Sequence, residues 1–533
     1  MKSFKFSLRQ LVSLGVSLLL GGVLFYFFLP AINFHSLMFL ILLLICLVFE
    51  VIIDFFFIAE EFEDFKNVLL TVFAIIAILV LLIILIGSFT SFDLFRANSY
   101  YNQITIEDGD FKKDVPLVEN VNTDIPIVDT ISANQLGDRK LGDLEQVSQF
   151  DVDEEYNLII YKGDQYRLSP LNYGGFFKFF TNKDSGIPGY ILVNTITQET
   201  TLVKLEDGIK YSPSAKFSKN LERHLRFQYP TSIFGKSHFE IDEDGLPFYV
   251  TPVESPQIGL FGGKVVTSAI ITNASTGESI EYALNDIPSW VDHLYGVDYL
   301  KDKAYKHYQY VHGFINLSST DEKTLTDEYT SVIINNEVMF LTGVTSVSSD
   351  NSIIGFIFMS AKTEKTTFYP CSGALERSAQ NSAEGLVQNL GYIAGYPIII
   401  NVNGVETYFM TLKDNSSLVK KYAMVNVKNY TLVSVGDTAS ETITSYNALL
   451  KNNKIIEGTL SSTEAKKSGT ISELYSAVID SNTFYFFKIE EDAISLYKSS
   501  IKTSEKQVLL KVGSKISFEY TSDNEVVSIE EIN

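Results

Sequence analysis

The chain has 533 residues, enough for three or four average domains. Asp and Glu number 64 against 42 Lys and Arg, so the formal charge is −22, and nearly all of it falls after residue 98. An acidic body repels phosphate backbones, which counts against nucleic-acid binding. The two cysteines, Cys46 and Cys371, are too few for a disulfide scaffold, and no Cys/His spacing indicates a zinc site.

Three apolar runs predict membrane-spanning helices over residues 11–29, 37–58 and 68–92, since each is close to the roughly 20 residues that a spanning helix needs. Positive charges precede the first run, at Lys2, Lys5 and Arg9. The positive-inside rule therefore predicts a cytoplasmic N-terminus and, after three crossings of the cell membrane, an extracytoplasmic body. The loop over residues 59–67 is acidic, which leaves the inverted topology open.

Two carboxylates lie inside the second run. Glu50 and Asp54 are four residues apart, so they share one face of a helix. Ionisable side chains are costly in a membrane span and indicate a protein-facing or ion-conducting patch. The alternative, which the sequence favours, is that both lie near the cytoplasmic interface and are solvated.

Two stretches of the body align with each other and predict a duplicated module, at residues 151–286 and 326–445. Residues 189–193 (GYILV) match residues 355–359 (GFIFM) at an offset of 166. In each copy a predicted helix, a Tyr-Pro pair and a turn of hairpin type then follow, the pairs at Tyr229-Pro230 and Tyr396-Pro397 and the turns at Asp244-Gly245 and Asn403-Gly404. Each copy is therefore predicted to be one helix with an antiparallel sheet, an α+β module.

Four further parts complete the predicted organisation. Residues 1–97 form the three-helix transmembrane segment, 98–150 an irregular or lightly stranded stalk or linker, and 287–325 an aromatic helical connector. Residues 446–533 are predicted to hold a helix and then a small β-barrel of the type that binds oligonucleotides or oligosaccharides, because five or six short strands follow one another there.

The connector carries the only tryptophan, Trp290, together with Tyr295, Tyr308 and Tyr310. Such an aromatic cluster indicates either an interaction face or the packing seam between the two modules. The seam is the more common outcome, so these four residues are candidates for an interaction site with that alternative beside them.

Motifs for catalysis, cofactors and metals fail at specific positions. No Gly-x-Ser-x-Gly is present. Glu240, Asp242 and Asp244 imitate the start of a calcium loop, but Thr251 stands where the loop needs its last glutamate. Cys371 has no histidine near it in sequence to act as a base. No catalytic, cofactor-binding or metal-ligating residue is therefore assigned.

The helix-then-hairpin pattern resembles the PepSY-type modules of bacterial envelope proteins. The residues that carry this resemblance are Thr276-Gly277-Glu278 after the strand at 269–272, and the strands at 404–412 and 421–435 after the helix at 372–390. The whole layout is similar to large membrane-anchored proteins of Gram-positive bacteria. The resemblance implies an extracytoplasmic, non-catalytic module that binds or restrains a partner, with peptidases as one partner class. Each predicted module is about twice the size of one PepSY unit, so two units per module, or another fold, stay open.

These observations predict a membrane-anchored interaction or scaffold protein of the cell envelope, binding another envelope protein, a cell-wall partner or itself through its modules. Two alternatives stay open: an envelope enzyme acting on cell-wall glycan or peptide, and a subunit of a membrane transport or secretion assembly. The first needs a catalytic pair that meets only in the fold. The second needs Glu50 and Asp54 to face a partner helix.

Overall fold

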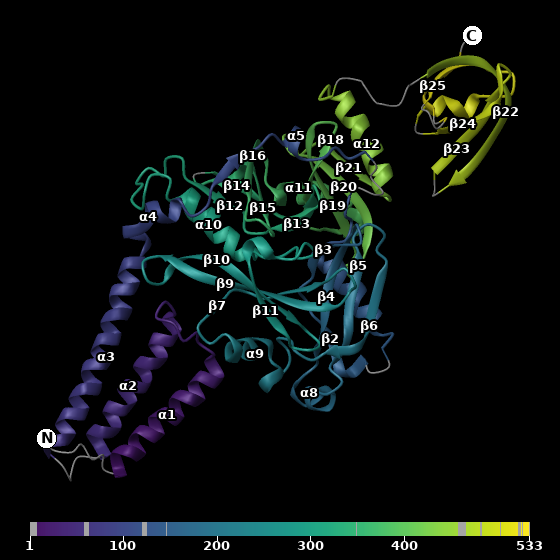
Figure 1. The fold of residues 1–533 in the computed structure, drawn as a ribbon. Coiled ribbons are helices and arrows are strands. Elements are labelled where there is room, and N and C mark those ends of the chain that lie inside the picture. The colour runs from purple at the N-terminus through teal and green to yellow at the C-terminus, as the bar shows by residue number, and fades with distance from the viewer. Residues whose placement is uncertain are drawn as a thin grey trace. The chain divides into compact units, whose positions relative to one another are not determined.

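The computed structural model describes residues 8–57, 63–119, 125–144, 147–347, 349–456, 465–479, 482–501, 503–520, 524 and 526–531. Two compact units divide the chain, Met1–Leu449 and Leu450–Asn533. The described part of the first contains three long apolar helices and four mainly antiparallel sheets, and that of the second contains one further sheet (Figure 1). The fold class is α+β, as predicted.

Three helices begin the described chain, α1 (Leu8–Phe28), α2 (Leu37–Phe57) and α3 (Glu63–Ser91). Their apolar windows have mean hydropathies of 2.2, 2.9 and 3.3, and each is long enough to cross a bilayer. This agrees with the three predicted spans and supports integration in a membrane.

The body of the first unit lies directly against the ends of these helices. Arg226 in α9 (Leu221–Gln228) donates from Nε to the carbonyl oxygen of Leu29, just after α1, at 2.9 Å. Beside it, Ile32 N donates to Pro230 O at 2.7 Å. At the end of α3, Phe261 N donates to Ser91 Oγ at 2.9 Å. The body therefore contacts the ends of α1 and α3 that lie opposite the beginning of α1 (Figure 1).

The segment after α3 is more regular than the predicted stalk. Its described residues include α4 (Asp93–Tyr101), β1 (Ile106–Asp108), α5 (Phe111–Asp114) and α7 (Thr130–Leu141). The Asp129 carboxylate caps α7 by accepting from Ser132 N at 2.8 Å. β1 pairs in parallel with β16 of the body. The sequence predicted an irregular or lightly stranded stalk here, and the structure has short helices in addition, since capping supplies order that apolar periodicity does not show.

Four sheets build the rest of the first unit. Sheet 1 contains β2 (Phe150–Val152), β3 (Asn157–Tyr161), β4 (Asp164–Tyr173), β5 (Ile187–Asn194) and β6 (Thr200–Ile209), with α8 (Phe176–Asn182) between β4 and β5. Sheet 2 contains β7 (Ile233–Phe234), β8 (His238–Ile241), β9 (Pro247–Ile258), β10 (Gly262–Asn273) and β11 (Ser279–Ala283). Sheet 3 contains β12 (Lys323–Leu325), β13 (Thr330–Ile334), β14 (Glu337–Ser346), β15 (Ser349–Ser360) and β16 (Thr366–Ala374), with β1 as an additional edge strand beside β16. Sheet 4 contains β17 (Ile393–Ala394), β18 (Ile398–Val402), β19 (Val405–Lys413), β20 (Val419–Asn426) and β21 (Val433–Gly436).

All four sheets have the same strand order. In each, the first and second strands both pair with the third, the third pairs with the fourth, and the fourth pairs with the fifth. One helix precedes the sheet each time: α7, α9, α10 (Val297–Gln309) and α11 (Glu376–Leu386). The helix α12 (Ala439–Asn452) follows sheet 4.

The turn between the fourth and fifth strands also recurs in detail. Its first side chain accepts hydrogen bonds from backbone N–H groups two and three residues later: Asn194 and Asn273 do so through Oδ1 and Ser360 through Oγ, at 2.9–3.1 Å. In sheet 4, Asn426 Oδ1 accepts only from the N–H three residues on, at 2.8 Å. The Tyr-Pro pairs that the sequence alignment matched are not equivalent, since Tyr229-Pro230 precedes β7 and Tyr396-Pro397 follows β17.

The C-terminal unit holds five strands, β22 (Ala465–Ile479), β23 (Asn482–Ile489), β24 (Asp492–Ser500), β25 (Lys515–Tyr520) and β26 (Val526–Glu531). Their order is β24-β23-β22-β25-β26, around buried Phe487, Tyr497 and Phe518. No ladder joins β24 to β26 in the described part of this unit. One backbone bond, from Lys498 N to Asn524 O at 3.0 Å, links the two edges. The predicted closed barrel is therefore not found.

Arg226 gives a test of how the body is held on α1. The Arg226→Met variant keeps the apolar stem but removes donors to the carbonyl groups of Leu29, Tyr229, Pro230 and Ser232. We expect the free energy of unfolding to fall by about 3 kcal/mol, because buried acceptors lose a charged donor. Chemical unfolding of the full chain in detergent, followed by Trp290 fluorescence, measures it. The control is Arg377→Met on the exposed face of α11, and equal stability of the two variants would contradict the expectation.

Candidate functional site

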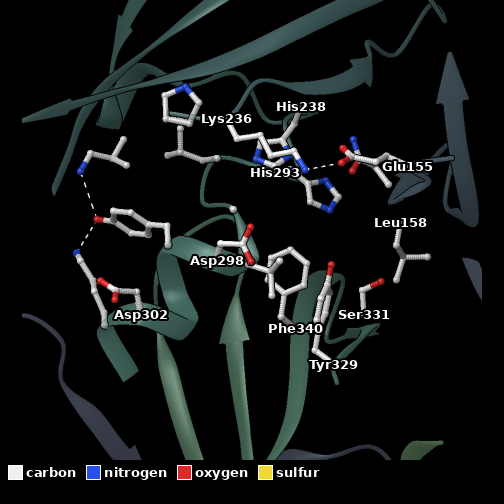
Figure 2. A pocket seen from close by; sticks show the side chains of 18 of the residues that line it. Glu155, Leu158, Lys236, His238, His293, Asp298, Asp302, Tyr329, Ser331 and Phe340 are labelled. Carbon is white, nitrogen blue, oxygen red and sulfur yellow. Dashed lines mark hydrogen bonds and ion pairs between the residues drawn. The ribbon is translucent and has the colours of Figure 1, made fainter. Parts of the chain in front are cut away.

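A cavity of about 780 Å³ lies where the sheets of the first unit meet (Figure 2). All four sheets contribute to its wall. The side chains include Asn157, Leu158 and Arg167 from sheet 1, His238, Pro252, Glu254 and Lys264 from sheet 2, Thr330, Ser331 and Phe340 from sheet 3, and Tyr396 between the first two strands of sheet 4. The helices α4, α7 and α10 complete it. A concave site of this size is typical of ligand pockets, and many of the side chains that line this one are charged or polar.

Two histidines stand at one side of the cavity, His238 on β8 and His293 just before α10. Their rings are stacked, with centroids 5.7 Å apart. His293 makes its own contacts with Glu240: Nδ1 lies 2.8 Å from Oε1, and the backbone N–H donates to the same oxygen at 2.9 Å. Burial raises the pKa of Glu240 above its usual range. The second histidine is thereby held in one orientation by a buried carboxyl group.

The imidazole ring of His238 is less fully hydrogen-bonded than that of His293. The side chain is buried, and Nε2 has no hydrogen-bond partner among the described residues. Burial, then the neighbouring His293 and Lys236, lowers the pKa of His238 to about 3, so the imidazole is neutral at physiological pH. A buried polar atom without a partner is costly, and this one belongs to a side chain that lines the cavity.

Arg167 on β4 supplies a buried positive charge. Its side chain donates from Nη1 to Ser331 Oγ at 2.7 Å and from Nε to Val128 O at 3.5 Å. None of the ion pairs between described residues includes Arg167, and the nearby Asp129 carboxylate is paired with Lys413. Burial lowers the pKa of Arg167 only to about 10, so it stays cationic. A buried guanidinium group that has no carboxylate partner can donate hydrogen bonds to an anionic oxygen of a ligand.

The other basic residues of the cavity are neutralised. Lys236 pairs with Glu155 at 2.6 Å, Lys264 with Glu254 at 3.0 Å and Lys306 with Asp302 at 2.9 Å. Figure 2 shows the Lys236–Glu155 pair beside the two histidines, with Tyr329, Ser331 and Phe340 together in another part of the wall. The wall thus combines aromatic surface with one unpaired cation and one unpartnered imidazole nitrogen among the residues that the structure describes.

The aromatic residues of the predicted connector lie elsewhere: the three candidate tyrosines are buried and Trp290 is half-buried against the core. Trp290 packs on Phe248 with ring centroids 5.1 Å apart. Tyr295 and Tyr308 are buried in the same cluster, which joins strands of sheets 2 and 3. Tyr310 is also buried and donates to Asp93 Oδ2 at 2.6 Å. Side chains placed in this way offer little surface to a partner and are arranged as a packing seam.

The structure places the two carboxylates of α2 against α1. Glu50 and Asp54 are both buried. Ser13 donates to Glu50 Oε1 at 3.0 Å and to Asp54 Oδ1 at 3.3 Å, and Ser17 donates to the other oxygen of Glu50. These contacts make the patch protein-facing within the anchor, rather than solvated as the sequence favoured.

Two other sequence candidates are also placed. Cys371 is buried, and burial raises the pKa of its thiol to about 12, so it is not a thiolate at neutral pH. Asp242 Oδ1 accepts from Asp244 N and Leu246 N within its own turn, while Glu240 is bonded to His293. No group of three or more potential metal-ligating side chains is found among the described residues.

The cavity residues carried no motif in the sequence, because they come from segments as distant as Asp129 and Tyr396. Only their local surroundings gave a signal, since His293 lies in the aromatic segment already singled out. No family model matches the chain. No curated protein matches it either.

His238 predicts an acid-sensitive body. Its pKa is about 3 in the folded chain and near 6.5 when unfolded, so protonation below pH 6.5 favours the unfolded chain. This contribution to stability is lost as pH falls from about 6.5 toward 3, by up to about 1.4 kcal/mol per pH unit. The variant His238→Gln should flatten the fall in free energy of unfolding over this range, measured by urea unfolding at several pH values. The exposed His312→Gln is the control, and identical slopes in both variants would refute the assignment.

Cys371 predicts an unreactive thiol. In a Cys46→Ala background, we expect iodoacetamide at pH 8 to leave the native protein unlabelled, because the buried thiol stays protonated. Unfolding in urea should restore full labelling, which mass spectrometry of the intact chain measures. Rapid labelling of the native protein would contradict this expectation and make Cys371 a candidate nucleophile.

Proposed function

We propose that this protein is a membrane-anchored, non-catalytic binding protein of the cell envelope, which holds part of a protein or cell-wall partner in the cavity between its four sheets. The observation that carries this proposal is that the same cavity is lined by a buried imidazole nitrogen without a partner among the described residues and by a buried guanidinium that forms no ion pair with a carboxylate among them. Both groups need an external partner to be fully satisfied. A ligand group with an anionic oxygen and a hydrogen-bonding neighbour suits them.

Binding is favoured over catalysis by the state of the reactive groups. His238 is neutral, and His293 is engaged by Glu240. No hydrogen bond joins either imidazole to a Ser, Thr or Cys side chain within the described chain, so the arrangement of a nucleophile with its base is not present there. The thiol that the sequence offered is buried and protonated.

The recurring sheets support a duplicated origin. We infer that the four sheets, each with its preceding helix, are tandem copies of one unit, so that each predicted module contains two. The turn that includes Thr276-Gly277 in sheet 2, on which the PepSY resemblance rests, has counterparts in the other three sheets. The strand order of the C-terminal sheet likewise supports an oligosaccharide-binding type of fold that is open between β24 and β26. An extracytoplasmic body follows from the positive-inside rule and from its contacts with the far ends of α1 and α3.

A photocrosslinking residue at Ile131 tests the proposal. Ile131 lines the cavity and is 58% exposed, and Leu386 on α11 is equally exposed but does not line it. With p-benzoylphenylalanine at either position in native cells, we expect a reproducible partner at 131 and none shared with 386. Mass spectrometry identifies it as polypeptide or cell-wall material.

A cavity-filling variant, Val297→Trp, provides the second comparison, since Val297 also lines the cavity. It should abolish capture at 131 while circular dichroism shows an unchanged fold. Capture that is equal at 131 and 386, or that persists in the filled variant, would show that the cavity is not the binding site.

A further inference from the structure

A cluster of four phenylalanine side chains lies exposed on sheet 1 and the segment before α9. It consists of Phe176, Phe177 and Phe180 on α8 and Phe217 on a short 3-10 turn, and we call it the phenylalanine patch. The rings contact one another, with centroids of Phe176–Phe180 and Phe180–Phe217 at 5.0 and 5.7 Å. Phe177 is 82% exposed, and the other three are 43–49% exposed.

Leaving these rings in water is unfavourable. Burial of a phenylalanine side chain is favourable because it removes apolar area from water, and contiguous exposed apolar patches generally mark an interaction surface. The rings on α8 follow one another in the sequence FFKFF, so the helix presents aromatic side chains on more than one face. The rings of the patch would therefore be more stable in an apolar environment than in water.

The patch is continuous with the end of the membrane anchor. Arg223 donates from Nη1 to Phe217 O at 3.0 Å and from Nη2 to Tyr26 O at 3.2 Å, and its guanidinium lies 4.2 Å from the Tyr26 ring centroid. Tyr26 lies within the apolar window of α1 that ends at Phe28. One arginine thus separates the patch from the last turn of a helix that spans the bilayer, and Figure 1 shows α8 and α9 near the level of that helix end.

A second contact places the same region at the boundary of the bilayer. Phe227, at the end of α9, is 61% exposed, and its ring centroid is 6.0 Å from that of Phe25 in α1. Aromatic side chains concentrate at the boundary between lipid and water. The exposed rings therefore extend sideways from α1 in the layer where aromatic residues are stable.

The charge around the patch is opposite to that of the chain. Lys178, Lys183, Lys216 and Lys219 surround it, in a protein of formal charge −22. None of the ion pairs between described residues includes these four lysines. Lys219 Nζ instead donates to Tyr211 Oη at 2.9 Å, and Lys183 Nζ lies 5.9 Å from the Phe180 ring centroid. Lysines beside exposed aromatic rings match an anionic lipid surface.

We propose that the phenylalanine patch inserts into the interfacial layer of the same bilayer that α1–α3 span, with its lysines against anionic lipid headgroups. This docks the body on the membrane by a second point beside the anchor. The proposal rests on the membrane span of α1, and it is independent of what the cavity binds.

Tryptophan fluorescence in vesicles tests it. The full chain carries Phe177→Trp in a Trp290→Phe background and is reconstituted in phosphatidylcholine vesicles containing phosphatidylglycerol, with or without brominated acyl chains. We expect a blue-shifted emission from the tryptophan at position 177 and loss of most of its intensity with brominated lipid. The control is Leu386→Trp in the same background, which should emit at longer wavelength without quenching. The same comparison with Trp290 retained, measuring the additional quenching over the parent, serves if the Trp290→Phe chain does not fold.

Each outcome decides the proposal. An emission from position 177 that is unquenched and as red-shifted as the emission from position 386 means that the patch faces water. A blue-shifted emission without quenching means that protein, such as a second copy of the chain, covers it. Both results overturn insertion. The substitutions Lys183→Gln and Lys216→Gln together should reduce quenching in the anionic vesicles and not in phosphatidylcholine alone, and no change in the anionic vesicles overturns the role of the lysines.

Discussion

The body depends on a backbone interaction that recurs in every sheet of the first unit. The carbonyl groups of Thr195, Ala274 and Ala361, each just inside the turn after the fourth strand, accept two N–H groups from the segment that leads into the preceding helix. In sheet 4, Val427 accepts one such bond, from Ala374. Because Val128 and Leu294 are among the donors, the same bonds place Asp129 and His293 at the cavity. The backbone bonds that fix the entry to each helix thus also position residues of the cavity wall.

The anchor and the body are joined by arginines rather than by apolar packing alone. Arg226 binds backbone carbonyl groups on both sides of the junction, and burial lowers its pKa only to about 10, so the charge persists. Helix C-terminal carbonyl groups lack intrahelical partners, and a cation is the favourable group there. The junction therefore satisfies the end of α1 and orients α9, whose neighbour in space is the phenylalanine patch.

Composition and strong local signals predicted the membrane spans and some of the turns. The three spans follow from uninterrupted apolar runs, and the hairpin turns at Asp244-Gly245 and Asn403-Gly404 do join paired strands. The strand order that the four sheets share could not be predicted from the sequence, because β7 and β17 have only two residues each and show no periodicity. The sequence placed the residues of α7 in a stalk and those of α10 in a connector. In the structure, α7 precedes sheet 1 and α10 precedes sheet 3. The cavity could not be predicted, since its wall is assembled from long-range pairings.

The connection between α3 and α4 is very short. A single residue, Phe92, separates the end of α3 from the beginning of α4. With so short a tether, and with a second attachment through Arg226 at α1, the cavity is held at one height and one tilt above the lipid. The protein cannot reach outward like a receptor on a flexible stem. Under the proposed function, a ligand of the cavity would therefore be bound close to the membrane surface.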